Sequence, residues 1–167
     1  MNLRITKRAL REKEMDILVE QLRRFPHIGF INARLWRTFQ HTYVATVNGD
    51  FVGVCVAFPL KRWTKIGPLV IRKQYQGRKY GKTLLTYVVK ELNQNNLFIG
   101  SSNPKVCAIA KDIGFRQKTS FFHIPFEIQR YLLAYLFTRF SLEYLLDAMK
   151  KKFRSGHWKY YYFLKMT

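Results

Sequence analysis

Acidic residues are scarce in this sequence. Asp and Glu total 10 of 167 residues against 30 Lys and Arg, which gives a formal net charge of +20. Such an excess of positive charge attracts polyanions over long distances. A nucleic-acid or ribosomal partner is therefore one prediction, and a generally basic surface without a special partner is the alternative. The scarcity also limits the candidates for a general base, since no carboxylate lies between Asp50 and Glu91.

Cysteines are few and long apolar runs are missing. Cys55 and Cys107 each lie in an apolar segment that we expect to be buried, and two cysteines indicate neither a disulfide framework nor a zinc cluster. We therefore predict no metal site. No apolar run reaches the length needed to cross a bilayer, and the first residues lack the apolar core of a signal peptide. A cytoplasmic location is the resulting expectation.

Apolar residues are nevertheless abundant. They make up 48% of the chain, which is enough for a real core in one domain spanning residues 1–167. Apolar runs, alternation and turn residues predict strands at residues 3–5, 43–47, 51–58, 66–71, 97–100, 115–124 and 158–164. Helical periodicity predicts helices at residues 8–25, 30–40, 82–92, 103–114, 128–137 and 142–153. Asn48 and Gly49 predict a tight hairpin between the second and third strands.

The most informative segment is the strand, turn and helix that begins at residue 65. Gly67 and Pro68 interrupt its apolar run, so we expect a kink or bulge there. The basic turn that follows contains Gly77 and Gly81, which allow unusual dihedral angles and close approach to a ligand. The helix N-terminus adds partial positive charge, and Arg78, Lys79 and Lys82 add full charges. This pattern predicts a site for a diphosphate; an ordinary basic turn without a ligand is the alternative.

Two motifs make the chain resemble the GCN5-related N-acetyltransferase (GNAT) superfamily. Gln76 and Gly81 match that family's acetyl-CoA signature, Gln/Arg-x-x-Gly-x-Gly/Ala, although Lys79 replaces the middle Gly. The second motif is Asn103, then a helix, then Gly-Phe at residues 114–115, with the spacing of the family. The resemblance covers roughly residues 40–124.

The resemblance implies an α/β fold with a mixed, mostly antiparallel sheet of six to seven strands. The sheet would be splayed at its centre, flanked by helices, and would carry a helical insertion at residues 125–154 before the last strand. The strands carrying Val70 and Ile99 would part at their C-terminal ends and admit acetyl-CoA, the acyl donor. The residues implied to bind it are Leu69, Val70, Ile71, Gln76, Gly77, Arg78, Lys79, Tyr80, Gly81, Lys82 and Asn103. The implied activity is N-acetyl transfer to an unidentified amine acceptor.

Catalytic side chains are harder to assign. The tyrosine that the family often uses as general acid falls at Ala110 here, so the usual acid is missing. Candidates for moving a proton are His123, Ser101, Ser102 and Tyr160. A main-chain N–H near Leu69 and Val70 could stabilise an oxyanion. Two alternatives stay open: a GNAT-fold enzyme that modifies a nucleic-acid base, and a non-catalytic basic binding module that kept the fold.

The tail offers further candidates for contact with a partner. The helical insertion at residues 125–154 could thicken the core, form a homodimer surface or act as a lid beside the acceptor. A basic cluster at residues 150–159 follows it and is the best candidate for contact with a polyanion, although a solvated helix end would look the same.

Overall fold

The computed structural model describes residues 2–25, 28–29, 31–93, 95–138 and 159–166. Its strands are β1 (Leu3–Lys7), β2 (His41–Val47), β3 (Asp50–Pro59), β4 (Trp63–Ile71), β5 (Asn96–Ser101), β6 (Arg116–Lys118) and β7 (Tyr161–Lys165). Its helices are α1 (Glu12–Arg24), α2 (Ala33–Arg37), α3 (Tyr80–Glu91), α4 (Pro104–Asp112) and α5 (Phe126–Thr138), with short 3-10 turns η1 (Lys73–Tyr75) and η2 (Phe121–His123). None of the helices in these described segments combines the length and the hydrophobicity that spanning a bilayer requires.

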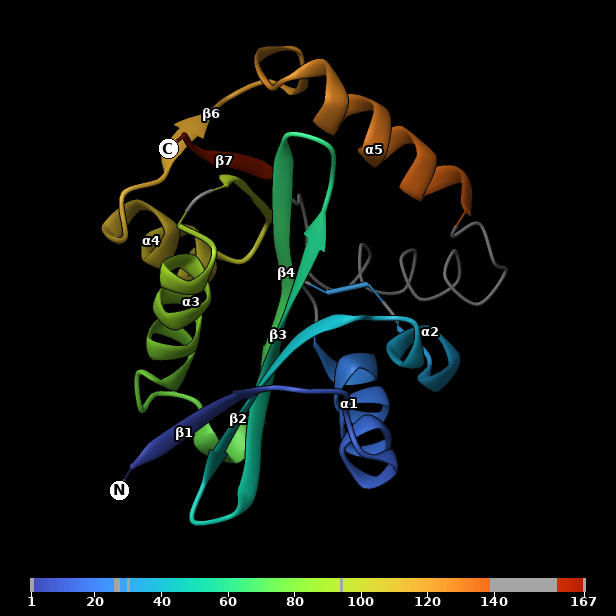
Figure 1. Ribbon diagram of the computed structural model, residues 1–167, viewed down its shortest axis with the longest axis vertical. Coiled ribbons are helices and arrows are strands. Elements are labelled where there is room, and N and C mark those ends of the chain that lie inside the picture. Colours follow the sequence, from blue (N-terminus) through green and yellow to red (C-terminus); the bar gives the residue numbers. More distant parts are fainter. Residues whose placement is uncertain (1, 26–27, 30, 94, 139–158, 167) are drawn as a thin grey trace.

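The described strands form one seven-stranded sheet in the order β1-β2-β3-β4-β5-β7-β6 (Figure 1). Every neighbouring pair is antiparallel except β4 and β5, which run parallel. The predicted fold class, a mixed and mostly antiparallel sheet flanked by helices, is confirmed. The predicted hairpin is also present, because Asn48 and Gly49 turn the chain between β2 and β3 with φ angles of 52° and 88°.

The sheet parts at its centre. β4 and β5 pair at Trp63 with Asn96, Thr64 with Leu97, and Lys65 with Phe98, and the ladder ends there. The remaining residues of β4 continue beside β3, while the remaining residues of β5 continue beside β7. The C-terminal halves of the two strands therefore diverge, as the resemblance implies.

A bulge in β4 lies just beyond the last shared pair. Cys55 of β3 is opposite Leu69 and Ala57 is opposite Ile66, so one residue of β3 faces Gly67 and Pro68 together. Gly67 has a φ of 126°, which glycine adopts far more readily than other residues. The kink predicted from this dipeptide is confirmed. Its effect is to place the side chains of Ile66 and Leu69 on the same face of the sheet, in one apolar cluster.

Helices cover both faces of the sheet. Leu97 and Ile99 of β5 pack into the cluster under α3 and α4. Phe98, between them, points to the other face and packs with Ile128 of α5. Helices α1 and α2 lie on that second face too, where Leu18 is completely buried. The cleft between the diverging strands therefore has different helices on its two sides (Figure 1).

Several predicted boundaries need correction. The strand predicted at 115–124 ends at Lys118, because Ser120 accepts a hydrogen bond from the main-chain N–H of Phe122 and so caps η2. The last strand begins at Tyr161, and the helix predicted from residue 8 begins at Glu12. The helix predicted at 128–137 is present as α5, whereas the one at 142–153 lies outside the described residues.

Candidate functional site

A cavity of about 410 Å³ lies where β4 and β5 diverge. It is bounded by the end of β4, the turn before α3, the first two turns of α4 and the segment that follows α1. The lining residues are Phe25, Ile28, Leu69, Ile71, Tyr75, Gln76, Gly77, Lys79, Tyr80, Gly81, Lys82, Asn103, Pro104, Lys105, Val106 and Ile109. Segments distant in the sequence thus meet at one hollow, as expected at a point where a sheet opens.

The β4 wall of the cavity offers main-chain groups. The N–H of Arg72 donates to the carbonyl of Val52 in β3, so Val70, two residues earlier, also directs its main-chain groups toward β3. Leu69 and Ile71 direct theirs to the opposite side, where β5 has moved away. The Ile71 carbonyl there accepts a hydrogen bond from the Gln76 side chain at 3.0 Å. The Leu69 and Ile71 N–H groups face the cleft.

The turn before α3 offers a row of N–H donors. Among the described residues, none accepts a hydrogen bond from the main-chain N–H groups of residues 77–82. The first intrahelical bond of α3 is the one from Thr83 to the Lys79 carbonyl, at 3.1 Å. Gly77 and Lys79 have φ angles of 82° and 61°, which turn successive amides toward one place. With the α3 dipole, this arrangement suits an anion.

Side chains around the turn fix its shape. Arg72 and Arg78 lie over the ring of Tyr75, with guanidinium-to-centroid distances of 5.7 and 6.0 Å. The Tyr75 and Tyr80 rings are 6.4 Å apart. Lys82 forms an ion pair with Asp112 and so links α3 to α4 across the edge of the cavity. Part of the positive charge expected from Lys82 is therefore balanced within the protein.

The opposite wall is the start of α4. Asn103 caps this helix, because its side-chain oxygen accepts a hydrogen bond from the Lys105 N–H at 2.9 Å. The Asn103 N–H in turn donates to the Ser101 hydroxyl at 3.0 Å. The capped helix presents Val106 and Ile109, three and six residues after Asn103, to the cavity. This wall is therefore mostly apolar.

Most residues predicted to bind acetyl-CoA meet at this cavity. Those that line it are Leu69, Ile71, Gln76, Gly77, Lys79, Tyr80, Gly81, Lys82 and Asn103. Val70 does not, because its side chain is buried on the other face of the sheet with α1. Arg78 does not line it either and is exposed.

Sequence reasoning missed several lining residues. Val106 and Ile109 could have been found, because helical spacing from Asn103 places them on one side of α4. Phe25 and Ile28 carry no local signal, since only the tertiary fold brings the end of α1 to this place.

The four residues predicted to move a proton do not line the cavity. Ser101 lies at the end of β5, where its hydroxyl accepts a hydrogen bond from the main-chain N–H of Asn103. Ser102 follows it in the sequence. His123 is exposed on η2, and Tyr160 is exposed just before β7. Ala110 is fully buried and carries only a methyl group, which cannot donate a proton. No carboxylate or imidazole is among the described lining residues.

Cys107 lies in α4, next to the lining residue Val106, but does not itself line the cavity. Its Sγ lies 3.7 Å from the Ser101 carbonyl, and burial raises the thiol pKa, an effect that the charge of Lys111 partly offsets. The thiol is therefore protonated at neutral pH. No described group of three or more His, Cys, Asp or Glu side chains could hold a metal ion.

Comparisons with known proteins agree with this geometry. The family model described as "Acetyltransferase (GNAT) family" matches residues 8–115. A comparison with curated proteins found no match.

Solved structures share the fold at low sequence identity. N-acetylglutamate synthase from Neisseria gonorrhoeae, complexed with coenzyme A and N-acetyl-glutamate, is 14% identical with a TM-score of 0.68; the match covers 99% of this chain and 35% of that one. The IAA acetyltransferase from Bacillus cereus is 18% identical with a TM-score of 0.58, over 98% of this chain and 97% of that one. A GNAT family acetyltransferase from Elizabethkingia anophelis with acetyl-CoA bound is 19% identical with a TM-score of 0.54, over 72% and 82%.

The sheet that parts after three shared pairs, the unpartnered amides of the turn and the family match over residues 8–115 lead to one conclusion. The chain belongs to the GNAT family of acetyltransferases.

Proposed function

We propose that the protein is an N-acetyltransferase that takes an acetyl group from acetyl-CoA and transfers it to an amine. The observation that carries the proposal is the row of main-chain N–H groups at residues 77–82, which lack protein partners among the described residues and border the cavity. The first N–H groups of a helix have no intrahelical partner and carry partial positive charge, so an anionic ligand is a natural acceptor for their hydrogen bonds. Structures with the same fold hold coenzyme A or acetyl-CoA.

The residues fit such a ligand along the length of the cavity. The amides of residues 77–82 and the α3 N-terminus would hold the diphosphate, with Lys79 adding charge. The outward amides of Leu69 and Ile71 would hold the amide-containing arm in the manner of an added strand. Val106 and Ile109 would provide the apolar wall. When bound, acetyl-CoA supplies a thioester that is already activated toward attack by an amine, so the protein mainly has to align the two reactants.

Proton transfer is the part of the reaction with fewest candidates. A lysine-type amine has a pKa of about 10.4 and must lose a proton before it can attack. Since no carboxylate or imidazole lines the described cavity, we propose that ordered water takes this proton. The Leu69 N–H, which faces the cleft beside the bulge, is the proposed donor to the developing oxyanion.

We propose further that the amine acceptor belongs to, or is bound with, a nucleic acid or a ribosomal component. The net charge of +20 supports this, because coenzyme A alone uses only a small part of the excess. The basic cluster predicted at 150–159 lies mostly outside the described residues; Lys159, within them, is exposed. The cytoplasmic location stays a prediction.

A second candidate, a non-catalytic binding module, draws support from Ala110 and from the lack of an acid or base among the described lining residues. Release of free thiol from acetyl-CoA in the presence of a panel of amines would exclude it. Modification of a nucleic-acid base is the third candidate, and unchanged nucleosides in cells that express the protein, measured by mass spectrometry, would count against it.

Calorimetric titration with acetyl-CoA tests the leading proposal. An ideal Cβ at Gly81 would lie 3.5 Å from Cγ1 of Ile71, which is an ordinary contact, and its φ is not in the left-handed range. Gly81→Ala should therefore fold and bind as the wild type does, whereas Gly81→Glu places a carboxylate among the amides. We expect Gly81→Glu to weaken binding by about tenfold or more. Absence of wild-type binding at millimolar acetyl-CoA would overturn the proposal.

A further inference from the structure

Two phenylalanine rings on one face of the molecule are almost completely exposed. Phe122 of η2 is 82% exposed and Phe126 in the first turn of α5 is 75% exposed. Scattered apolar residues on a surface need no explanation, but two large exposed rings on adjoining elements, η2 and α5, are of the kind that marks an interaction site.

Burial of the opposite side of α5 fixes the orientation of this patch. Ile128 and Leu132 pack into the cluster that contains Phe98 and Trp63 of the sheet. Phe126, Arg130 and Leu133, spaced four and three residues apart, are exposed and so lie on the outer side of the helix. The outer stripe of α5 therefore combines an aromatic ring with a cation.

Phe122 is held in place from behind. Its ring meets the Phe121 ring edge-on, with the centroids 5.9 Å apart. Phe121 in turn packs against Tyr162 of β7 at 6.2 Å. The Ser120 hydroxyl accepts a hydrogen bond from the Phe122 N–H at 3.3 Å and caps η2. The ring is thus presented by a packed base rather than by a long loop, which lowers the entropy lost on binding.

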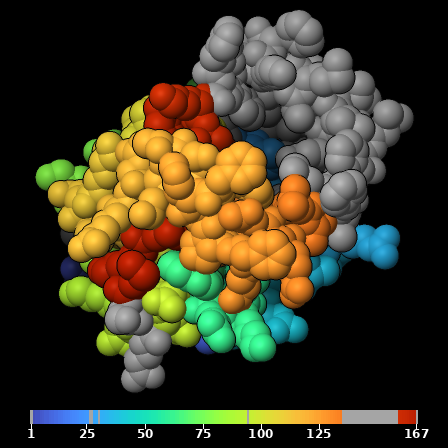
Figure 2. All heavy atoms as spheres, turned by 90° about the horizontal axis from the view of Figure 1, so that it is seen from above, coloured from blue at the N-terminus to red at the C-terminus, as the bar shows by residue number. Residues whose placement is uncertain are grey.

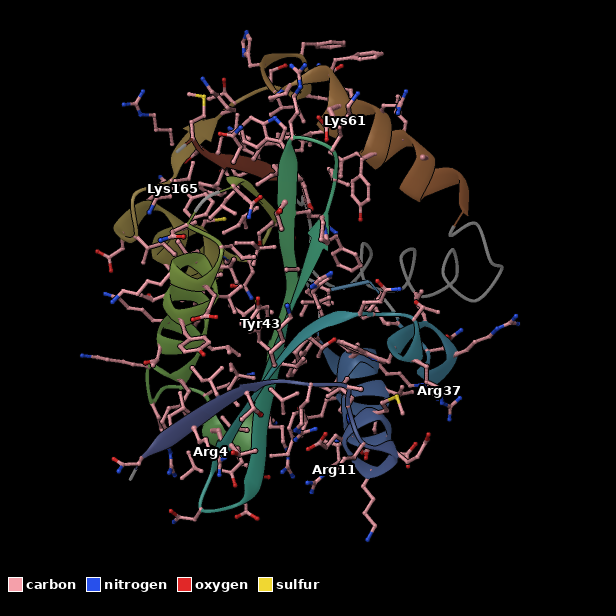
Figure 3. The ribbon with its side chains drawn as sticks, viewed as in Figure 1. Arg4, Arg11, Arg37, Tyr43, Lys61 and Lys165 are labelled. Atoms are coloured by element: carbon pink, nitrogen blue, oxygen red, sulfur yellow. The ribbon has the colours of Figure 1, made fainter. Side chains whose placement is uncertain are left out.

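Among the described residues, the segments that carry and flank the two rings are mostly positive. The β3–β4 loop contributes Lys61 and Arg62, and Figure 3 shows Lys61 at the tip of that loop beside the start of α5. The segment at 116–134 adds Arg116, Lys118 and Arg130 against one carboxylate, Glu127. The Glu127 carboxylate accepts a hydrogen bond from the main-chain N–H of Arg62 at 2.9 Å, and this bond connects the loop to α5.

We call Phe122, Phe126, Lys61, Arg62 and Arg130 the aromatic–basic face. Figure 2 shows the segments that carry these residues side by side on one side of the molecule: the β3–β4 loop in sea green, residues 116–125 in amber and α5 in orange. Among the described residues, no carboxylate forms an ion pair with Lys61, Arg62 or Arg130 of this face. The face is therefore open to an external anion.

We propose that the aromatic–basic face binds single-stranded nucleic acid. Exposed rings offer stacking surfaces for unpaired bases, and the neighbouring cations attract phosphates. A duplex hides its bases from such rings, and a second copy of this chain would bring two basic faces together. This inference rests on the proposed association with nucleic acid and names its surface, while acetyl-CoA binding uses a different part of the molecule.

Fluorescence anisotropy without acetyl-CoA provides the test. The probes are labelled single-stranded RNA and DNA of about 16 nucleotides and a duplex of equal length. We expect both single strands to bind more tightly than the duplex, with affinity that falls as salt rises. The double variant Phe122→Ala/Phe126→Ala should weaken binding by about tenfold or more with an unchanged salt slope. Lys61→Gln/Arg130→Gln should weaken binding and reduce the slope.

Matched controls lie on α3, across the sheet. Tyr87→Ala removes an aromatic side chain that is 37% exposed, and Lys90→Gln removes an exposed charge. Tyr87→Ala should keep wild-type affinity, and Lys90→Gln should change it less than the two substitutions in the aromatic–basic face do. Equal binding of duplex and single strands, or equal affinity for the Phe122→Ala/Phe126→Ala variant and the wild type, would overturn the proposal. So would sedimentation showing a wild-type dimer that this double variant dissociates. A failed acetyl-CoA titration would overturn the acetyl-transfer proposal and leave this one untouched.

Discussion

The Glu14 carboxylate holds the start of the first helix in place. It accepts hydrogen bonds from Arg8 Nη1 and Nη2 at 2.8 and 2.6 Å and from the Arg11 N–H at 2.8 Å. Burial alone would raise the pKa of this group, but the hydrogen bonds and charges of Arg8 and Arg11 outweigh burial and lower the pKa. The charged form is therefore favoured in the folded protein.

A glutamine at this position should destabilise the fold in a pH-dependent way. Glu14→Gln should lower the free energy of unfolding by about 1–3 kcal/mol near neutral pH, because it replaces charge-assisted hydrogen bonds with neutral ones. Since the folded pKa lies below the ordinary value of 4.5, the extra stability is present above that value and is lost as pH falls through the folded pKa. Urea denaturation at neutral and acidic pH should therefore show the difference shrinking in acid.

Glu20→Gln is the control for that measurement. Glu20 pairs with Arg24 on the same helix, but its side chain is 70% exposed. Such pairs contribute about 0.5 kcal/mol or less, so the control should barely change unfolding at any pH. If both substitutions lowered the free energy of unfolding equally, the burial of Glu14 and its bonds to Arg8 would not account for its contribution.

Glu14 also shows what local sequence cannot predict. The mixed charges of residues 11–14 predict a solvated helix face, yet Glu14 is 7% exposed. Its burial depends on Arg8, which lies before the helix and folds back over it. By contrast, the positive φ angles of Gly49 and Gly77 follow from turn signals within a few residues.

Among the secondary-structure elements, β4 does most to shape the site. Its bulge at Gly67 interrupts the ladder with β3 just where β5 departs, and the ladder resumes at Leu69. Leu69 and Ile71 therefore direct their amides away from β3, to the side that β5 has left. A Cβ at Gly67 would meet no atom within 4 Å beyond its chain neighbours, so the φ of 126°, rather than packing against other segments, opposes a substitution there.

Gly67→Ala should therefore lower both stability and acetyl-CoA affinity. Forcing alanine into this dihedral region costs about 1–3 kcal/mol, which the chain can reduce by straightening the bulge and moving Leu69. Gly49→Ala is the matched control, since Gly49 has a φ of 88° and equally open space but lies in the distant hairpin. Thermal unfolding should show lower stability for both variants. Calorimetry should show weaker acetyl-CoA binding for Gly67→Ala alone. Unchanged affinity would mean that the bulge does not shape the site.

The ion pair between α3 and α4 leads to an opposite prediction. Lys82 lines the cavity but is paired with Asp112, and both side chains are about half exposed. Asp112→Asn should free the Lys82 charge for the phosphates and tighten acetyl-CoA binding by about twofold to fivefold, because an exposed pair contributes at most about 1 kcal/mol. The gain should shrink at high salt. Weaker binding would instead mean that the pair is needed to shape the cavity.

Elements marked by Gly, Pro or Asn at decisive positions are predictable from the sequence, whereas a cap hidden in an alternating pattern and contacts set by the tertiary fold are not. The hairpin after β2, the bulge in β4 and the capped start of α4 follow from Gly, Pro and Asn at decisive positions. The early end of β6 depends on Ser120, which caps a turn inside an alternating pattern. The approach of Phe25 and Ile28 to the cavity depends on how α1 packs, which no local pattern encodes.

For the whole molecule, the dominant property is the charge of +20. Like charges repel in the compact state, and four ion pairs among the described residues offset only a small part of the excess. Added salt shortens the Debye length from about 30 Å at 0.01 M to about 8 Å at 0.15 M and so weakens the repulsion.

The melting temperature should therefore rise with sodium chloride over this range. Differential scanning calorimetry measures it, and glycerol at matched osmolality controls for general solute effects. A melting temperature that falls with salt would show that attractive pairs, rather than repulsion, dominate the electrostatics. The sequence composition alone predicts the sign of this effect, whereas the distribution of charge around Phe122 and Phe126 required the fold.

The short ladder between β4 and β5 has a mechanical consequence. Three residue pairs between β4 and β5 join strands β1–β4 to strands β5–β7. Five residue pairs join the other edge of β5 to β7. A force that pulls β1–β4 away from β5–β7 should therefore separate this seam before β5 parts from β7, because fewer residue pairs share the load there. The same line along which a ligand is proposed to enter is thus where these two parts of the sheet should come apart.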